Sequence, residues 1–371
     1  MVMLVPPSCP QPQLRPSLLT LPRLCAAVLL AVAGATGAQT WQVIDLATLA
    51  PNSTTVVRGP NAGGAAVGGG RLIKGGQLAR LRQGLVFEAG AALAIEGIAG
   101  SDQSTVFGLN DVGGLVGAAN TPTSVRAFVT TRTGATRQLP PLAGDVASGA
   151  YGINNSGHAV GFSSGPQGER ATQWSPDGVP TLLPGASGGA TSRAFSINNR
   201  GDIVGVMGTG AARRGVRWSG NAAPQPLAPL AGHQASEAVS VNARGDAVGY
   251  SQTASGQRRA TMWEAHGGAV DLGGFSGATM SQAFGSNDAG VVVGSSGDSH
   301  EQRAFIWSRA DGLRDLNTLI GAANVVLTKA VGINNPGTII ALGHDKPADG
   351  HEHAHDHEGP LRVVLLRRAG N

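Results

Sequence analysis

The chain has 371 residues, of which 57 are Gly, 8 Phe, 5 Trp and 2 Tyr, and 41% are hydrophobic. That hydrophobic fraction argues against disorder, and abundant Gly without a collagen period is typical of an all-β protein with many turns. The formal net charge is +4, and the basic residues stand singly along the chain. Nucleic acid is therefore not an expected partner.

The N-terminus has the pattern of an export signal. Arg15 and Arg23 precede an apolar run from Leu24 to Ala33, with small residues following up to Ala38. The run is too short to span a bilayer as a helix. We therefore expect residues 1–38 to be a signal peptide and residues 39–371 to be a secreted or periplasmic protein without a transmembrane segment. Both cysteines lie in the leader, so no disulfide is expected.

The rest of the chain repeats one unit. The segment Asn154–Gly161, with Gly three and seven residues after the first Asn, recurs with variations. Its copies start at Asn61, Asn110, Asn154, Asn198, Asn242, Asn287 and Asn334, at spacings of 49, 44, 44, 44, 45 and 47 residues. Apolar residues flank each copy, and the Asn-x-x-Gly pattern predicts the tight turn of a β-hairpin. We interpret the seven Asn residues as turn formers; the alternative is a role in ligand binding.

A third strand follows each hairpin. Arg and Trp four residues apart share one face of a strand; the Trp positions are Trp174, Trp218, Trp263 and Trp307. The first, degenerate copy has Gln77 and Leu81 at these places. The row of Trp residues could form a binding platform. We expect packing between units instead, because equivalent positions recur in every unit.

A fourth strand ends each unit with two apolar residues three apart, often followed by Gly. Four short strands in about 44 residues is the period of β-propeller blades. The expected blades are residues 52–100, 101–144, 145–188, 189–232, 233–277, 278–321 and 322–371, the last together with 41–50.

The final unit indicates how the ring closes. It lacks a fourth strand at the C-terminus, whereas Asp45–Leu49 near the N-terminus matches Asp315–Leu319, the fourth strand of the sixth unit. We therefore predict an all-β fold, a seven-bladed β-propeller of four-stranded antiparallel blades whose N-terminal strand completes the last blade. Such overlap removes open sheet edges.

These motifs resemble the HAF-repeat family of bacterial extracellular repeat proteins. Residues 283–321 show the likeness best, with Ala283–Asn287, Gly290, Arg303–Trp307 and Asp315-Leu316. The resemblance covers about 41–371 and implies an exported repeat protein. It carries no assigned reaction, so it implies no catalytic residues.

Few residues suggest chemistry. Ser163 and Ser187 each lie in a Gly-x-Ser-x-Gly pattern, but both fall in predicted β-structure and not on a strand-to-helix elbow. An insertion at 344–359 contains His351, His353, His355 and His357. Alternating His residues could bind Zn²⁺, Cu²⁺ or Ni²⁺; the alternative is a solvated loop that binds metals only adventitiously.

The functional expectation is an exported, monomeric, non-catalytic scaffold without a cofactor. Its ligand would be an unknown protein, polysaccharide or envelope component. Two alternatives remain open: a carbohydrate-active lyase or hydrolase with its site at the channel mouth, and metal capture by the His-rich loop.

Overall fold

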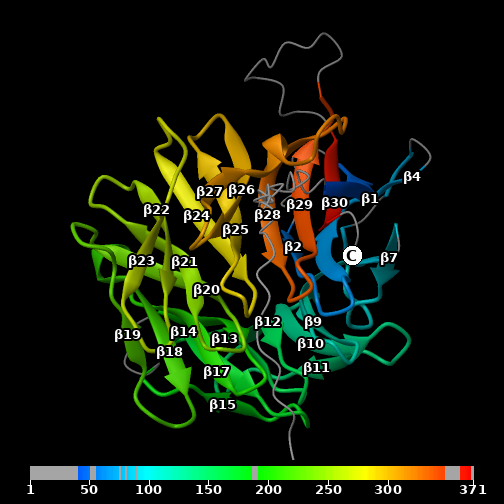
Figure 1. Cartoon of the computed structure of the whole chain (residues 1–371). Coiled ribbons are helices and arrows are strands. Elements are labelled where there is room, and N and C mark those ends of the chain that lie inside the picture. Colours follow the sequence, from blue (N-terminus) through cyan, green and yellow to red (C-terminus); the bar gives the residue numbers. More distant parts are fainter. Residues whose placement is uncertain are drawn as a thin grey trace, which may run out of the picture. The chain divides into compact units, whose positions relative to one another are not determined.

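The computed structural model describes residues 41–50, 56–74, 77–79, 82–88, 90–185, 191–346 and 360–368, all within one compact unit that runs from Gln39 to Asn371. Almost all regular structure in this part of the chain is β-strand (Figure 1). No helix among the described residues is long and apolar enough to cross a membrane.

The strands form seven four-stranded antiparallel units in the described residues. The unit of β12 (Ala147–Ile153), β13 (Ala159–Gly165), β14 (Gly168–Trp174) and β15 (Pro180–Leu182) is representative: each strand pairs with the next along the chain. The fifth and sixth units are joined into one sheet by a single bridge between Arg258 and Met280.

The other units follow the same order. The first consists of β2 (Val56–Arg58), β3 (Ala66–Gly70), β6 (Gln83–Glu88) and β7 (Ala91–Ile95), and the second of β8 (Gln103–Leu109), β9 (Gly114–Asn120), β10 (Val125–Thr131) and β11 (Arg137–Leu139). The fourth consists of β16 (Ser192–Ile197), β17 (Asp202–Met207), β18 (Arg214–Ser219) and β19 (Gln225–Leu227), and the fifth of β20 (Ala235–Val241), β21 (Ala247–Gln252), β22 (Arg258–Trp263) and β23 (Ala269–Gly273). The sixth consists of β24 (Met280–Ser286), β25 (Val292–Gly297), β26 (Gln302–Ser308) and β27 (Gly312–Asp315).

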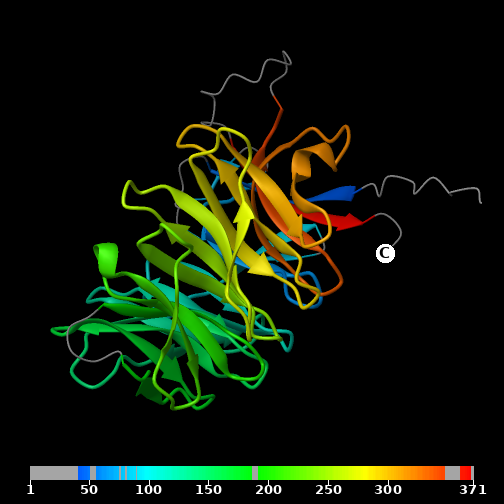
Figure 2. The same ribbon diagram turned by 60° about the vertical axis from the view of Figure 1, so that its left-hand side comes forward.

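The seventh unit contains both ends of the described chain. β28 (Val326–Ile333) and β29 (Ile339–His344) are followed by β30 (Leu361–Arg368), and β1 (Trp41–Leu49) pairs antiparallel with β30. The N-terminal strand thus lies beside the C-terminal one (Figures 1 and 2). The predicted fold class and the predicted closure are confirmed.

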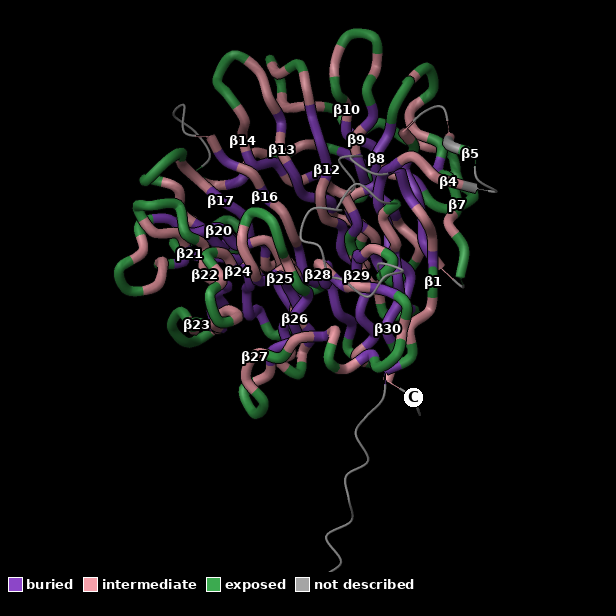
Figure 3. Tube along the Cα trace, turned by 90° about the horizontal axis from the view of Figure 1, so that it is seen from above, coloured by how far each residue is buried: buried purple, intermediate pink, exposed green. Residues whose placement is uncertain are grey.

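The units pack side by side around a centre (Figure 3). Their first strands β8, β12, β16, β20, β24 and β28 lie innermost, and buried residues fill the space between neighbouring sheets. Between the second and third units, for example, Val116 and Leu139 pack with Trp174, and all three are almost fully buried. Each sheet therefore has both faces covered by its neighbours.

The prediction for the first unit's third strand was wrong. Gln77 lies in a separate small hairpin, β4 (Ile73–Lys74) and β5 (Gln77–Leu78), which is inserted between the second and third strands. The third strand is β6, in which Phe87 pairs with Ala66 just as Trp174 pairs with Ala159 in the third unit. The insertion accounts for the longer spacing of 49 residues between Asn61 and Asn110.

Candidate functional site: the central channel

The seven repeated Asn residues form a closed cycle of hydrogen bonds. In each blade the side-chain Nδ2 donates to the backbone oxygen of the Asn in the next blade, and the last donates to the first. The donor–acceptor distances, starting from Asn61, Asn110, Asn154, Asn198, Asn242, Asn287 and Asn334, are 3.2, 2.9, 3.3, 2.9, 3.0, 3.2 and 2.9 Å. These bonds run once around the ring and tie every blade to its neighbour.

The same side chains also shape their own turns. The Oδ1 atom of Asn154 accepts a hydrogen bond from the His158 N–H at 3.0 Å, and the equivalent bond is present in all seven copies. Gly157 has φ +83°, a conformation that a side chain would disfavour. The Asn residues therefore make the contacts that their interpretation as turn formers requires.

The four Trp residues lie between blades. Trp174 and Trp218 are fully buried, and Trp263 and Trp307 are 3% and 8% exposed. Three of the indole N–H groups donate to a backbone oxygen of the preceding blade: Trp174 to Pro140 at 2.7 Å, Trp218 to Pro184 at 2.9 Å and Trp263 to Ala228 at 2.7 Å. Rings buried in this way do not form an open platform for a ligand.

A β-bulge in the innermost strands directs side chains into the channel. In β12 the pairing with β13 skips Tyr151, and equivalent register shifts occur in the first strand of blades two to seven. Bulges of this kind re-aim a side chain. The residues three positions before each Asn, which line the channel, are Arg58, Phe107, Tyr151, Phe195, Val239, Phe284 and Val331.

Together with the residues that follow them, these side chains enclose a central cavity of about 270 Å³ at the end of the channel that carries the Asn turns. We call this the turn end and the opposite one the charged end. The volume is near the lower limit for small-molecule pockets. It therefore suits a small ligand or one end of a larger ligand.

Aromatic rings form one side of this cavity. The Tyr151 ring centroid lies 5.2 Å from that of Phe107, 5.6 Å from Phe195 and 5.7 Å from Phe162. Burial raises the pKa of Tyr151, so the phenol stays neutral near neutral pH. The cluster offers flat apolar surface with one hydroxyl.

Toward the charged end, ion pairs join neighbouring blades. Arg193 in β16 binds Glu169 in β14 through two hydrogen bonds of 2.6 and 2.7 Å. The Arg193 guanidinium also lies 5.6 Å from the centre of the Phe162 ring. The Glu169 hydrogen bond is the main reason that the pKa of Arg193 is raised.

One blade further, Glu237 in β20 forms a second cluster. Its carboxylate is bound by Arg213, and the Tyr250 hydroxyl donates to it at 3.1 Å. Arg258 lies over the Tyr250 ring at 4.5 Å. Burial, followed by the charge of Glu237, raises the pKa of Tyr250. Tyr151 thus lines the channel cavity, whereas Tyr250 is buried on β21 against Glu237.

Two further cations, Arg58 and Lys329, lie on adjacent innermost strands, β2 and β28. Lys329 Nζ is 5.0 Å from the Phe284 ring centroid. Burial lowers the pKa of Lys329, and the charge of Arg58 lowers it further. Arg58 remains accessible to solvent in the channel although the blades surround it. Enclosure by the blades lowers the pKa of Arg58, whereas its electrostatic interactions with Tyr151 and Glu237 raise it.

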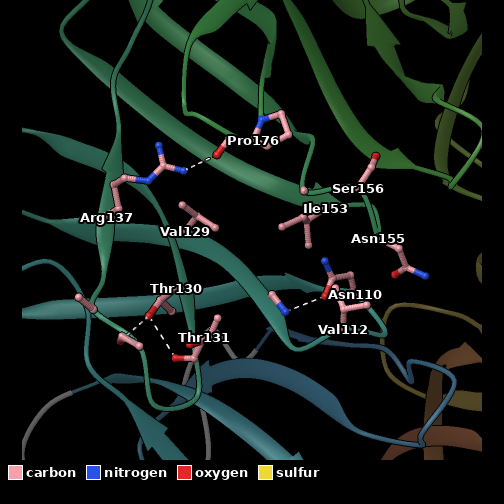
Figure 4. Close-up of a pocket in the computed structure, with 14 residues that line it drawn as sticks. Asn110, Val112, Val129, Thr130, Thr131, Arg137, Ile153, Asn155, Ser156 and Pro176 are labelled. Atoms are coloured by element: carbon pink, nitrogen blue, oxygen red, sulfur yellow. Dashed lines mark hydrogen bonds between the residues drawn. The ribbon is translucent and has the colours of Figure 1, made fainter.

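A second pocket, of about 420 Å³, lies outside the channel between the second and third blades (Figure 4). Val129 lines it, whereas the equivalent residue of the fourth blade, Arg217, fills that place and donates to the Gly245 oxygen at 2.7 Å. Arg137 crosses the pocket's edge and donates to the Pro176 oxygen at 2.6 Å. The pocket is a gap left by a smaller side chain.

The remaining sequence motifs do not assemble into a site among the described residues. Ser163 is fully buried on β13, and its hydroxyl donates to Asp145 at 2.6 Å. Ser187 and the His-rich residues His351, His353, His355 and His357 lie outside the described residues. In the part of the chain that is described, no group of three or more His, Cys, Asp or Glu residues could hold a metal ion.

Sequence reasoning missed the channel residues. The signal that could have found them is the position three before each Asn. This position is occupied by Phe107, Tyr151, Phe195 and Phe284 in four copies, but by Arg58 in the first copy. A position that is bulky in most copies and charged in one differs from the repeated core positions.

Seven four-stranded antiparallel blades around a channel, closed by pairing of the N-terminal strand with the C-terminal strands, define a β-propeller. No protein-family model and no curated protein sequence matches the chain.

Solved structures show the same fold. One is a catalytically inactive virginiamycin B lyase from Staphylococcus aureus with quinupristin, with 9% sequence identity and a TM-score of 0.51; the match covers 88% of this chain and 99% of that one. Another is the β-propeller domain of the Trilobed protease from Pyrococcus furiosus, with 9% sequence identity and a TM-score of 0.52; the match covers 85% of this chain and 96% of that one. Acylaminoacyl peptidase from Pyrococcus horikoshii is similar as well, with 11% sequence identity and a TM-score of 0.50. That match covers 85% of this chain but only 52%, about half, of the peptidase. At these identities the likeness shows the fold alone.

Proposed function

We propose that this chain is an exported, monomeric, non-catalytic β-propeller of the HAF-repeat type that binds its ligand in the central channel. The observation that carries the proposal is the contrast between repeated and non-repeated residues. The repeated Asn and Trp residues bond to neighbouring blades, whereas the channel positions vary: the residue three before the Asn is Phe, Tyr, Val or Arg, and the residue five before it is Arg, Glu or Lys in some blades. A polysaccharide or other envelope component is the partner class that suits an exported protein of this kind.

The state of the acids and tyrosines supports binding over catalysis. Glu169 and Glu237 are each bound to an Arg, which occupies their carboxylate oxygens. Neither carboxylate is therefore free to transfer a proton to a ligand as a general acid. The raised pKa of Tyr151 and of Tyr250 also makes each phenol a weak source of a basic phenolate near neutral pH.

The proposal is tested with a panel of purified bacterial polysaccharides and their oligosaccharides by titration calorimetry. Saturable binding to at least one of them, without change in the ligand, is the expected result. Failure of every saccharide to bind would contradict the polysaccharide assignment. Export is tested separately by finding whether the N-terminus of the protein purified from culture medium or periplasm begins near Gln39.

The alternative is a carbohydrate-active lyase or hydrolase. The cluster of Tyr250, Glu237 and Arg258 favours it, since a phenol beside cations could act on an acidic sugar. Incubation with the same polysaccharides, monitored by ultraviolet absorbance for unsaturated products and by reducing ends, tests this function. Product release that is lost in Tyr250→Phe would establish the enzyme and overturn the non-catalytic proposal.

A further inference from the structure

Two cations in the channel have no polar partner among the described residues. Arg58 lines the cavity and makes no hydrogen bond or ion pair in this part of the chain. Lys329 is half-buried on the neighbouring strand; its ammonium lies 5.0 Å from the centre of the Phe284 ring and makes no hydrogen bond or ion pair with a described residue. Arg58 is exposed to the solvent of the channel, whereas Lys329 is half-buried. A cation enclosed by protein costs free energy unless an opposite charge or hydrogen-bond acceptors accompany it, and this cost applies to Lys329.

The two residues also oppose each other electrostatically. Lys329 is close enough to Arg58 for the Arg58 charge to help lower its pKa. The acid that Arg58 senses, Glu237, is already bound by Arg213 and Tyr250. Among the described residues, no carboxylate binds either of these two like charges, which lie on the neighbouring strands β2 and β28.

Neither cation is required by the repeat. In the other blades the position of Arg58 carries Phe, Tyr or Val, and these residues complete the blade equally well. The position of Lys329, five before the Asn, carries Thr105, Gly149, Arg193, Glu237 or Gln282 in later blades. A structural role shared by all blades therefore does not explain why Arg and Lys stand here.

Among the charged residues described above in or beside the channel, the cations Arg58, Arg193, Arg213, Arg258 and Lys329 outnumber the anions Glu169 and Glu237. An excess of one sign of charge concentrates ligands of the opposite sign. The Phe284 ring, in the cavity wall and 5.0 Å from Lys329 Nζ, adds flat apolar surface beside that cation. The site thus combines a place for an anionic group with a place for the apolar face of a ring.

We infer that Arg58 and Lys329 bind the carboxylate of an acidic sugar whose ring packs against the aromatic wall of the channel. A uronic acid has both features that the site requires, a carboxylate and a face of C–H groups. Arg58 can present two parallel N–H donors to the carboxylate, and Lys329 adds a second positive charge. The inference rests on the proposed function and specifies the ligand class for that same channel.

The test is titration calorimetry of the full mature chain with glucuronate, galacturonate, glucose and inorganic phosphate at one fixed ionic strength. The variants are Arg58→Gln and Lys329→Gln. The matched control is Arg309→Gln, which removes the same charge from an exposed ion pair with Glu264. We expect a uronate to bind more tightly than glucose or phosphate, each channel variant to weaken it about tenfold or more, and the control to change it less than about twofold.

A stability measurement separates a binding role from a structural one. If Arg58 serves a ligand, Arg58→Gln should melt at the wild-type temperature or above it in the absence of ligand, because an unpaired charge is removed. A clear fall in melting temperature for Arg58→Gln, without a change in uronate binding, would overturn the inference.

The other outcomes are also decisive. Glucose binding as tight as glucuronate and indifferent to Arg58→Gln would overturn the anionic assignment while leaving a channel that binds saccharides. Phosphate binding as tight as either uronate, with the same loss in Arg58→Gln, would overturn the acidic-sugar assignment in favour of a general oxyanion site. Absence of uronate binding at millimolar concentration would overturn the inference, whereas the proposed function is tested by polysaccharide binding.

Discussion

Asn334 donates a hydrogen bond from its side-chain Nδ2 to the backbone oxygen of Asn61, 2.9 Å away and 273 residues earlier in the chain. This bond completes the cycle that the six preceding Asn residues build. One side chain, repeated seven times, thus forms the turns, joins the blades and closes the ring. The repeated residues therefore build the scaffold, and the proposed ligand site consists of residues that differ between the copies.

Replacing Asn154 by Ala should destabilise the protein. Asn154 is buried, and the variant loses three bonds of its side chain: one to the Asn198 oxygen, one from the His158 N–H and one from the Ser156 hydroxyl. With about 1–3 kcal/mol for each buried group left without a partner, we expect a loss of about 2–4 kcal/mol in the free energy of unfolding, measured with urea. Val112→Ala, at a residue that is 70% exposed in the equivalent turn of the second blade, is the control and should cost less than about 1 kcal/mol. Equal losses would contradict the structural role.

The closure of the ring depends on β1. Leu46 and Leu49 of this strand are buried against the first and last blades. Deleting residues 39–50 should therefore strongly lower the melting temperature or abolish cooperative unfolding. Leu46→Asp should cost several kcal/mol, because a charge enters an apolar core, whereas Gln42→Asp on the exposed side of the strand should cost less than about 1 kcal/mol. Unchanged thermal stability after the deletion would remove the support for a closed ring.

The sequence predicts the ring well and the channel poorly. Turn, strand and closure elements recur at nearly constant spacing, so their roles can be compared across copies. Tyr151 and Phe107 lie at bulges, which reverse the alternation of faces that a sequence pattern assumes. In the first blade, the inserted β4–β5 hairpin displaced the third strand from its expected place.

The ion pairs between blades could not be predicted from the sequence for a different reason. Glu169–Arg193 and Arg213–Glu237 each join residues 24 apart, a spacing that no single-strand or helix period produces. It arises because the third strand of one blade begins beside the first strand of the next. The spacing of 24 residues can therefore be explained only once the arrangement of the blades is known.

Lys329→Met should stabilise the protein at neutral pH. Burial, together with the Arg58 charge, lowers the pKa of Lys329 in the folded state, so the unfolded chain binds the proton more readily. Wild-type stability should consequently rise as the pH increases through the lowered pKa toward the ordinary value of about 10.4. We expect Lys329→Met to gain roughly 0.5–1 kcal/mol at pH 7 by urea unfolding and to lose that advantage at high pH. A loss of stability at pH 7 would contradict the description of Lys329 as an uncompensated charge.

Asp246 should contribute to stability above acidic pH. Burial alone would raise its pKa, but hydrogen bonds from the Ala265 N–H, from Asn242 and from Arg244 outweigh burial and lower it. The contribution is therefore present above about pH 4 and lost as the pH falls through the lower folded pKa.

At pH 7, Asp246→Asn should cost about 1–3 kcal/mol in urea unfolding, and the difference from wild type should shrink in strong acid. The exposed Asp177→Asn is the control and should stay within about 0.5 kcal/mol of wild type at both pH values. A difference that is the same at pH 7 and in strong acid would exclude ionisation as its cause.

The ligand is proposed to bind inside the channel, and a variant that fills the channel with a large side chain tests this location most directly. Val239 stands where other blades place Phe or Tyr, so the backbone there accommodates a large ring directed inward. Val239→Trp should fold with wild-type cooperativity and reduce the affinity for the bound saccharide at least tenfold in titration calorimetry. Val179→Trp, at a residue that is 60% exposed on a turn of the third blade, should bind as the wild type does. Undiminished binding by a folded Val239→Trp variant would place the ligand elsewhere and contradict the account.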